Sequence, residues 1–361
     1  MRVLILTNND IGLYKFRREL LEELIKKNKV FICLPDGEFI QKLKKIGCRF
    51  VNCTLMDRRG TNPLMDLRLL EFYRRIIKKA RPDIVFTYTI KPNVYGGIAC
   101  ASLGVPYVAN ITGLGTAIEN GGILQKITLI LYRAGLRKAQ KVFFQNAENR
   151  DFMLKHHVVK DSYDMIPGSG VNLEQYKVEE YPNRETIDFV FVARVMKEKG
   201  IDQYLEAASY IRKKYVNTRF HICGFCEQNY NERLEMLQKQ GTIIYHGLVS
   251  NMIEIYKMCS CIVHPTYYPE GMSNVLLEAC AVGRPIITTG RSGCREVVDD
   301  GVNGFIVKER DSKDLIEKLE KFLSLSVEER RQMGLAGRGK VEKEFDRKIV
   351  VNKYIKEVNH E

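Results

Sequence analysis

The residues best suited to chemistry lie around two carboxylates, Glu270 and Glu278, which follow the apolar segment Cys261–Pro265. The pattern predicts a strand, a tight turn and a helix, and Gly271 in the turn lets a ligand approach the backbone closely. Backbone N–H groups are expected to be available at the start of that helix, on Met272, Ser273 and Asn274. The hydroxyls of a sugar nucleotide suit this arrangement, with Glu270 at the sugar and Glu278 at the ribose. A helix that merely begins with an acidic turn is the alternative.

Two cations in a second segment add the elements of a diphosphate site. Arg194 and Lys199 follow the apolar run Phe189–Ala193, which predicts a strand. A diphosphate requires cations aimed at it, and a loop that leads from a strand into a helix can supply them. Because these cations can replace a divalent ion and the sequence has no Asp-x-Asp pair, we expect no metal ion and no cofactor.

Two glycines and a pair of cysteines also follow predicted strands. Gly224 ends the predicted strand Arg219–Cys223 and is expected to shape a pocket for the base, whereas Gly293 lies in a loop that either contacts the ligand or is only structural. Cys223 and Cys226 form the only Cys-x-x-Cys pair among ten cysteines. Without a second pair of metal ligands, we interpret all ten as reduced core residues rather than as a zinc or redox site.

The elements that must position these residues alternate between short β-branched runs and helical periods along the whole chain. This alternation predicts an α/β fold of two doubly wound, Rossmann-like domains that face a central cleft. The length of 361 residues agrees, because a single core stops growing at roughly 250 to 300 residues. We predict a first domain over residues 1–172, a second domain that binds the nucleotide sugar over 173–344, and a helix over 345–361 that packs back on the first domain.

Eleven strands are expected from the apolar runs. They are Arg2–Thr7, Lys29–Leu34, Phe50–Cys53, Ile84–Tyr88, Tyr107–Ile111, Lys141–Gln145, Ile187–Ala193, Arg219–Cys223, Thr242–Tyr245, Cys261–Pro265 and Pro285–Thr289. The first helix is expected over Tyr14–Lys27, which leaves the residues around Gly12 in a loop.

Charge is distributed unequally between the two halves of the chain. Residues 1–170 contain 28 Lys and Arg against 15 Asp and Glu, whereas residues 171–361 contain 29 of each, so the net charge of +13 belongs to the first half. A surface of one sign concentrates ligands of the other, which favours anionic lipid, a lipid-linked phosphate or nucleic acid as a partner. A solvated basic surface without a partner is the alternative. Residues 1–170 contain no nucleic-acid recognition motif, so we expect no nucleic acid.

Neither a signal peptide nor a membrane span is expected. The chain opens directly on a strand, and the longest uncharged stretch, Pro92–Ile118, is broken by Pro106, Asn110 and five glycines. The expected location is cytoplasmic, at the inner face of the cell membrane.

The basic stretch Gly122–Lys141 is amphipathic and could lie on an anionic membrane surface. Its apolar residues are Leu124, Ile127, Leu131 and Ala134, beside Lys126, Arg133, Arg137 and Lys138. An ordinary core-facing helix is the alternative.

Taken together, the chemistry-bearing segments of the second half resemble glycosyltransferase family four. The likeness covers nearly the whole chain and is densest in Arg194–Gly200, Pro269–Ala279, Gly283–Pro285 and Glu296–Val307. It implies the GT-B fold and an enzyme that retains anomeric configuration. The resemblance further implies that Arg194 and Lys199 stabilise the leaving diphosphate, that Glu270 contacts the transferred sugar, and that Glu278 binds the ribose.

The first half resembles the bacterial polysaccharide and lipid-linked oligosaccharide branch of that family, including N-acetylgalactosaminyltransferases. The resemblance lies in Asn9–Arg17, Thr89–Gly97 and Asn110–Gly115. It implies that the acceptor is bound by Gly12, Lys91, Thr112 and Gly113, with Lys91 at an acceptor phosphate. Many relatives carry a histidine in the loop of Thr112 and Gly113, so no histidine role is assigned there.

The function that the resemblance implies is transfer of a sugar, with N-acetylhexosamine favoured, from a UDP-sugar to a polyprenyl-diphosphate-linked saccharide. A soluble acceptor, a sugar-nucleotide epimerase and a hydrolase are alternatives. A nucleic-acid-binding protein is the alternative outside the enzymes.

Overall fold

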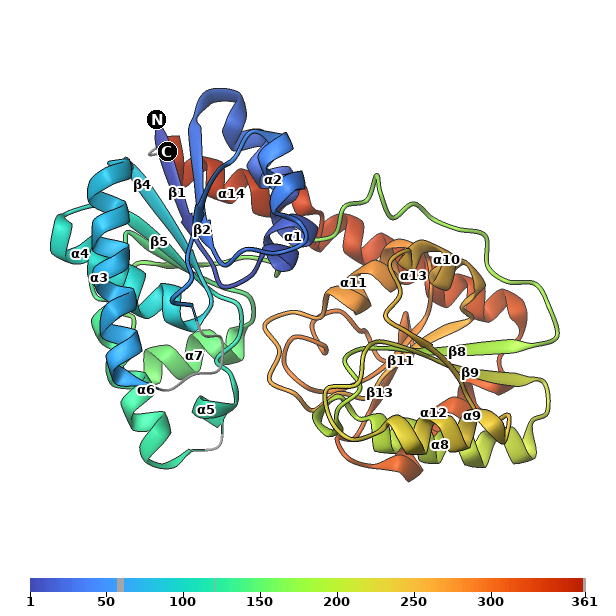
Figure 1. The fold of residues 1–361 in the computed structure, drawn as a ribbon. Helices are drawn as coiled ribbons and strands as arrows, with labels where there is room; N and C mark the ends of the chain where they lie inside the picture. Colours follow the sequence, from blue (N-terminus) through green and yellow to red (C-terminus); the bar gives the residue numbers. More distant parts are fainter. Residues whose placement is uncertain (57–61, 120, 360–361) are drawn as a thin grey trace. The chain divides into compact units, whose positions relative to one another are not determined.

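The computed structural model describes residues 1–56, 62–119 and 121–359, and the chain divides into two compact units (Figure 1). Unit 1 comprises Met1–Gly170 and Arg347–Glu361, and unit 2 comprises Val171–Asp346. These boundaries lie two residues from the predicted ones, because the segments that join the units pair with each other. Val171 bridges Asp346, and its N–H donates to the Phe345 carbonyl at 2.8 Å. Both joining segments therefore belong to unit 2.

Unit 1 contains a parallel sheet in the order β3-β2-β1-β4-β5-β6-β7. Its strands are β1 Arg2–Leu6, β2 Lys29–Leu34, β3 Arg49–Asn52, β4 Ile84–Tyr88, β5 Tyr107–Ile111, β6 Lys141–Phe144 and β7 Tyr163–Met165. Its helices are α1 Asp10–Lys27, α2 Ile40–Ile46, α3 Pro63–Ala80, the π-helical η1 Pro92–Gly96, α4 Gly97–Leu103, α5 Thr116–Glu119, α6 Gly122–Leu136, α7 Ala147–Lys155 and α14 Arg347–Asn359. All residues of β4 and β5 are buried, as parallel strands covered on both faces must be.

Helices cover both faces of the unit 1 sheet (Figure 1). On one face, α1, α2 and α14 share a core with alternate residues of the strands. On the other, α3 and α4 pack beside α6 and α7. This layering is the doubly wound arrangement that the alternating pattern predicts.

The last helix is built into the core of unit 1. Tyr354 of α14 is fully buried, packs edge-on against Phe86 and Phe143, and receives a hydrogen bond at 2.6 Å from the Asn110 side chain. Arg347 anchors the start of the helix by donating to both oxygens of Glu19, at 2.8 and 2.9 Å. The C-terminal helix is therefore part of the hydrophobic core rather than an addition to the surface.

Unit 2 contains a second parallel sheet, in the order β10-β9-β8-β11-β12-β13. Its strands are β8 Ile187–Val192, β9 Thr218–Cys223, β10 Ile244–Gly247, β11 Cys261–His264, β12 Ile286–Thr289 and β13 Gly304–Val307. Its helices are the 3-10 turn η2 Lys197–Lys199, α8 Ile201–Lys214, α9 Asn231–Lys239, α10 Met252–Met258, α11 Asn274–Ala281, α12 Ser312–Ser324 and α13 Val327–Glu344. One face is covered by α8, α9 and α12 and the other by α10, α11 and α13.

Two strands and the start of the first helix are among the features that differ from the sequence prediction. The strands β7 and β13 were not predicted, because β7 is three half-buried residues and β13 directly follows a turn. The first helix begins at Asp10, not Tyr14, because the Asn9 side chain caps it by accepting the Gly12 N–H at 2.6 Å. Gly12 therefore lies in the first turn of α1 and not in a loop.

Candidate active site

The chemistry-bearing residues of unit 2 lie where the strand order reverses. β9 and β10 lie on one side of β8, and β11, β12 and β13 lie on the other. The loops after β8 and β11 therefore leave neighbouring strand ends in opposite directions, which is where open parallel sheets bind ligands. One of these loops carries Arg194 and Lys199, and the other carries Glu270.

The fold brings Lys199 and Glu270 into direct contact across 71 residues of sequence. The Lys199 ammonium donates to a carboxylate oxygen of Glu270, and their side chains are only 10% and 18% exposed. Both residues were predicted for the same site, and the structure places them side by side.

Arg194 is held by a carboxylate that the sequence analysis did not single out. Its guanidinium donates to Glu227, in the loop after β9. That loop runs beside the arginine, because Val195 bridges Cys226 and the Glu227 N–H donates to the Val195 carbonyl at 3.1 Å. The sequence offers one signal for Glu227, an acidic residue shortly after the predicted strand Arg219–Cys223.

A second unpredicted residue, Tyr268, lies next to both cations. The Arg194 guanidinium carbon is 5.4 Å and the Lys199 ammonium nitrogen 4.8 Å from the centroid of its ring. Both distances are within the range of cation–π attraction.

The turn that carries Glu270 packs against the loop of Gly293. Gly293 has a φ of +87°, and a Cβ there would lie 2.8 Å from the Glu270 Cβ, so a larger residue would displace the turn. The Ser273 N–H donates to the Gly293 carbonyl at 2.8 Å. The Ser273 N–H is therefore already used, and the donor cluster predicted at the start of α11 loses this member.

Glu278 lies in the middle of α11, where one oxygen accepts the Tyr256 hydroxyl at 2.8 Å. Burial, followed by the charge of Glu278, raises the pKa of Tyr256 well above its usual range, so the phenol remains a donor to this carboxylate. Gly224 lies at the end of β9, and its N–H donates to the Gly247 carbonyl at 2.7 Å. This bond joins the loop after β9 to the end of β10.

His264, the last residue of β11, is a buried imidazole next to this cluster. It is 2% exposed, and within the described part of the chain neither ring nitrogen makes a hydrogen bond of good geometry. Burial, and to a lesser extent the positive charge of Lys199, lowers the pKa of His264 from 6.5 to about 3. The ring is therefore neutral at physiological pH.

Acidification is expected to destabilise the wild type more than His264→Leu. The unfolded chain takes up a proton at His264 near pH 6.5 and the folded chain only near pH 3, so this stability is lost as the pH falls below about 6.5. The loss should amount to about 2 kcal/mol between about pH 7 and about pH 5. Urea unfolding of both proteins at each pH measures it, and an equal loss in the variant would contradict the shift.

The predicted acceptor residues lie at the corresponding edge of unit 1, where the strand order reverses between β1 and β4. Gly12 follows β1, Lys91 follows β4, and Thr112 and Gly113 follow the neighbouring β5. The Lys91 ammonium forms an ion pair with Asp66 at 2.8 Å, and Asp66 also accepts the Tyr95 hydroxyl at 2.8 Å. The positive charge predicted to bind a phosphate is therefore partly compensated.

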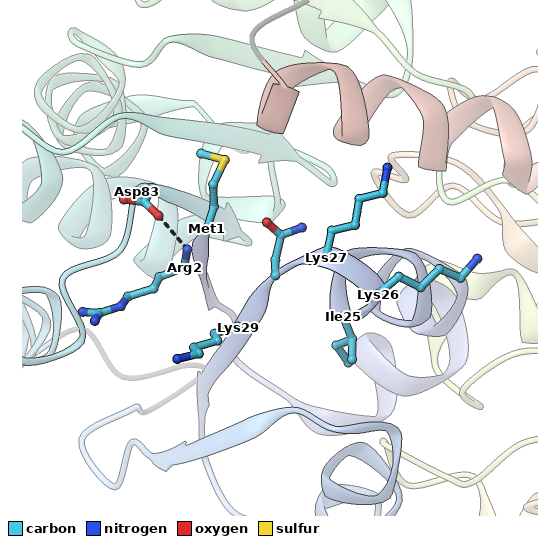
Figure 2. A pocket seen from close by; sticks show the side chains of 8 residues that line it. Met1, Arg2, Ile25, Lys26, Lys27, Lys29 and Asp83 are labelled. Atoms are coloured by element: carbon cyan, nitrogen blue, oxygen red, sulfur yellow. Dashed lines mark hydrogen bonds between the residues drawn. The ribbon is translucent and has the colours of Figure 1, made fainter.

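A hollow of about 480 Å³ lies elsewhere, at the amino ends of β1 and β2 (Figure 2). It is lined by Arg2, Lys26, Lys27, Lys29 and the single acid Asp83, which accepts the Arg2 N–H at 2.7 Å. Because ligands of parallel sheets bind at the carboxyl ends of the strands, this basic hollow is not part of the candidate site.

All ten cysteines are free thiols, and nine of them are buried. Burial raises the pKa of Cys223 to about 12, and the Cys226 sulfur lies 3.7 Å from the Tyr245 hydroxyl. Across residues 1–56, 62–119 and 121–359, no cluster of His, Cys, Asp and Glu is arranged to hold a metal ion.

Comparison with known proteins decides the family. The model of the family "Glycosyl transferases group 1" matches residues 174–340, and the "Glycosyl transferase 4-like domain" matches residues 16–168. The chain is a family-four glycosyltransferase. The predicted resemblance is confirmed, and the matched segments fall within unit 2 and unit 1, respectively.

Two curated relatives show what this glycosyltransferase is similar to. It is 26% identical to the N,N'-diacetylbacillosaminyl-diphospho-undecaprenol alpha-1,3-N-acetylgalactosaminyltransferase of Campylobacter jejuni, with 99% of this chain and 98% of that protein covered. It is also 26% identical to the UDP-Gal:alpha-D-GlcNAc-diphosphoundecaprenol alpha-1,3-galactosyltransferase of Escherichia coli, with 80% and 78% covered.

Solved structures establish the fold of the glycosyltransferase. HepE of Anabaena, solved in complex with UDP and glucose, superposes with a TM-score of 0.80 at 16% identity and covers 100% of this chain and 99% of its own. Sucrose-phosphate synthase of Thermosynechococcus elongatus gives 0.81 at 18% identity, with 100% and 98% covered. The prediction of the GT-B fold, with two Rossmann-like domains, is confirmed.

Proposed function

We propose that this glycosyltransferase moves a sugar, with N-acetylhexosamine favoured, from a UDP donor to a saccharide linked to polyprenyl diphosphate, during assembly of a bacterial surface polysaccharide or glycan. The observation that carries the proposal is the cluster of Arg194, Lys199 and Glu270 where the strand order of unit 2 reverses. Two cations and a sugar-binding carboxylate in one place are what a nucleotide diphosphate sugar requires.

Each residue has a role in the proposed chemistry. An acceptor hydroxyl attacks the anomeric carbon while the bond from that carbon to the diphosphate oxygen breaks. Arg194 and Lys199 stabilise the charge that develops on the leaving diphosphate, which accepts the proton of the acceptor hydroxyl. Glu270 accepts hydrogen bonds from the hydroxyls of the transferred sugar, and Glu278 accepts those of the ribose.

Retention of configuration follows from attack on the face from which the diphosphate leaves. Both relatives are named as alpha-1,3-transferases, so transfer from a donor whose sugar is alpha-linked to the nucleotide would retain the configuration. Such a reaction depends on stabilising the leaving group, which fits a site where two cations are held close together.

The uridine nucleotide is supported by two comparisons. HepE was solved with UDP bound, and the Escherichia coli relative is named for a UDP-sugar. N-acetylhexosamine is favoured because the Campylobacter relative, which matches over nearly the full length of both chains, is named as an N-acetylgalactosaminyltransferase.

The acceptor proposal is supported by the relatives and by the charge of unit 1. Both relatives are named for acceptors linked to undecaprenyl through a diphosphate. Residues 1–170 and 347–361 contain 32 Lys and Arg against 17 Asp and Glu, whereas residues 171–346 contain 25 against 27. The entire basic excess thus lies in unit 1, which carries Gly12, Lys91, Thr112 and Gly113.

Unit 1 also has a surface suited to an anionic membrane, which we call the α6 face. It consists of the exposed residues Ile123, Leu124, Lys126, Ile127 and Ile130, of which Ile123 is 78% and Ile130 60% exposed. A helix with exposed isoleucines beside cations on one side, and buried residues on the other, is typical of docking at a lipid interface. No helix among the described residues is long and apolar enough to cross a membrane.

The exposed side of α6 differs in part from the predicted one. Leu131 is half-buried and packs on the core, and Arg133 donates to the carbonyls of His156 and His157 at 2.8 and 3.3 Å. Arg133 therefore stabilises the fold. Lys126, Arg137 and Lys138 remain as the cations that we propose to contact anionic lipid.

The direct test incubates the purified protein with a panel of radiolabelled nucleotide sugars and a bacterial membrane lipid extract. Label from UDP-N-acetylhexosamine should enter the organic phase, because the product stays attached to the lipid. Label transferred only to a water-soluble saccharide would indicate a soluble acceptor, and release of free sugar would indicate a hydrolase. Either result would contradict the lipid-linked acceptor.

We further propose that transfer requires no metal ion, because Arg194 and Lys199 supply the charge at the diphosphate. EDTA is expected to leave the initial rate of transfer unchanged. Loss of activity that added magnesium restores would contradict this proposal. A control with EDTA saturated by magnesium separates chelation from other effects of the compound.

A further inference from the structure

We propose that Tyr268 is the positioning residue of the donor site, whose ring holds Arg194 and Lys199 together at the place of the diphosphate. This inference rests on the proposed donor site and assigns a role to a residue outside the reacting atoms. Arg194 and Lys199 come from one loop, and Tyr268 comes from the loop after the neighbouring strand β11.

The ring contacts both cations at once. The guanidinium carbon of Arg194 and the ammonium nitrogen of Lys199 lie 5.4 and 4.8 Å from the same ring centroid. Two positive groups repel each other, whereas the π-electrons of an aromatic ring attract each of them. Each cation also forms an ion pair, Arg194 with Glu227 and Lys199 with Glu270.

Hydrogen bonds fix the loop that presents the ring. The Tyr267 N–H donates to the Glu198 carbonyl at 2.9 Å, and the Tyr268 N–H donates to the Thr266 hydroxyl oxygen at 3.1 Å. Gly200, with a φ of +77°, lets the two loops touch, because a Cβ there would lie 2.1 Å from the Pro265 carbonyl oxygen. The loop that carries Tyr268 and the loop that carries Arg194 and Lys199 are therefore fixed relative to each other.

This arrangement explains how the two cations can stay in place when their carboxylate partners form hydrogen bonds to a ligand instead. When a sugar occupies Glu270, the hydroxyls of the sugar compete for the carboxylate that Lys199 contacts in this structure. The ring offers no hydrogen bond that a ligand could take away, so it retains Lys199 and Arg194 during the exchange. The carboxylates can thus turn to the ligand without releasing the cations.

Two substitutions separate the ring from its hydroxyl. Tyr268→Phe keeps the ring and Tyr268→Leu removes it. Tyr268→Leu should weaken UDP binding by about tenfold or more, because two cation–π contacts are lost, and Tyr268→Phe should bind UDP within about twofold of the wild type. Uridine, which lacks the phosphates, should bind all three proteins equally. Isothermal titration with UDP and with uridine measures this, and the melting temperature of each variant reports its folding.

The results of these titrations distinguish a failure of the positioning role from a failure of the proposed donor. Equal UDP affinity in Tyr268→Leu and the wild type, or an equal loss in Tyr268→Phe, would overturn the role of the ring. A parallel loss of uridine binding in Tyr268→Leu would also overturn it, because it would indicate a general disturbance of the site. Failure of the wild type to bind UDP would instead contradict the proposed donor, and the positioning role would fall with it.

Discussion

Lys199→Ala and Glu270→Gln are each expected to lower the rate of sugar transfer by at least about a hundredfold. Lys199→Ala removes a cation at the leaving diphosphate, in a site where a preorganised charge contributes most. It also leaves the Glu270 carboxylate, 18% exposed, without this ion-pair partner and next to an anionic ligand. Glu270→Gln removes the charged acceptor at the transferred sugar. Initial rates with a radiolabelled UDP-sugar and lipid acceptor measure both effects.

Lys197→Ala is the matched control for this experiment. Lys197 lies in the same short η2 turn as Lys199, but it is exposed, so its loss should leave transfer nearly unchanged. Circular dichroism of all three variants shows whether the fold is kept. A near-normal rate in Lys199→Ala or Glu270→Gln would remove that residue from the proposed site.

Replacing Lys126, Arg137 and Lys138 by glutamine is expected to weaken binding to anionic vesicles by about a hundredfold. A cation near an anionic lipid surface contributes about 1 kcal/mol, so three of them amount to about 3 kcal/mol. Binding by the wild type should be reversible, should decrease with salt, and should be much weaker to neutral vesicles. Sedimentation with phosphatidylserine-containing and with phosphatidylcholine vesicles measures these differences.

The basic hollow at the amino ends of β1 and β2 provides the control (Figure 2). Replacing Lys26, Lys27 and Lys29 by glutamine removes the same charge from the same unit but leaves the α6 face intact. If both triple variants lose binding equally, net charge rather than the position of the cations in and just after α6 determines docking. Equal binding of the wild type to both kinds of vesicle would contradict docking through charge altogether.

Much of the fold could be predicted from the sequence, because parallel strands buried on both faces leave continuous apolar runs. β2, β4 and β5 were predicted to the residue; β4 and β5 are entirely buried, and β2 is mostly buried. β7 escaped prediction because its three residues are only half-buried. The early start of α1 depends on one side chain, Asn9, whose capping role competes with the loop that Gly12 suggests.

The site was predictable only in part, because contacts between its loops depend on the order of the strands in the sheet. Arg194 and Glu270 could be found because each follows an apolar strand and belongs to a recognisable segment. Their contacts with Glu227 and Tyr268 depend on which strands are neighbours in the sheet. Local sequence patterns predict the strands but not their order. The ion pair of Lys91 with Asp66, 25 residues earlier, was missed for the same reason.

The membership of α14 in unit 1 has a consequence for biosynthesis. Unit 2 is continuous in sequence, whereas unit 1 needs Tyr354 to fill the space between Phe86 and Phe143. On the ribosome, the strands of unit 1 are made first, but its core stays incomplete until α14 follows, so all of unit 2 is synthesised before unit 1 can close. Until α14 follows, the apolar side chains that it covers, among them Phe86 and Phe143, remain exposed on the nascent chain.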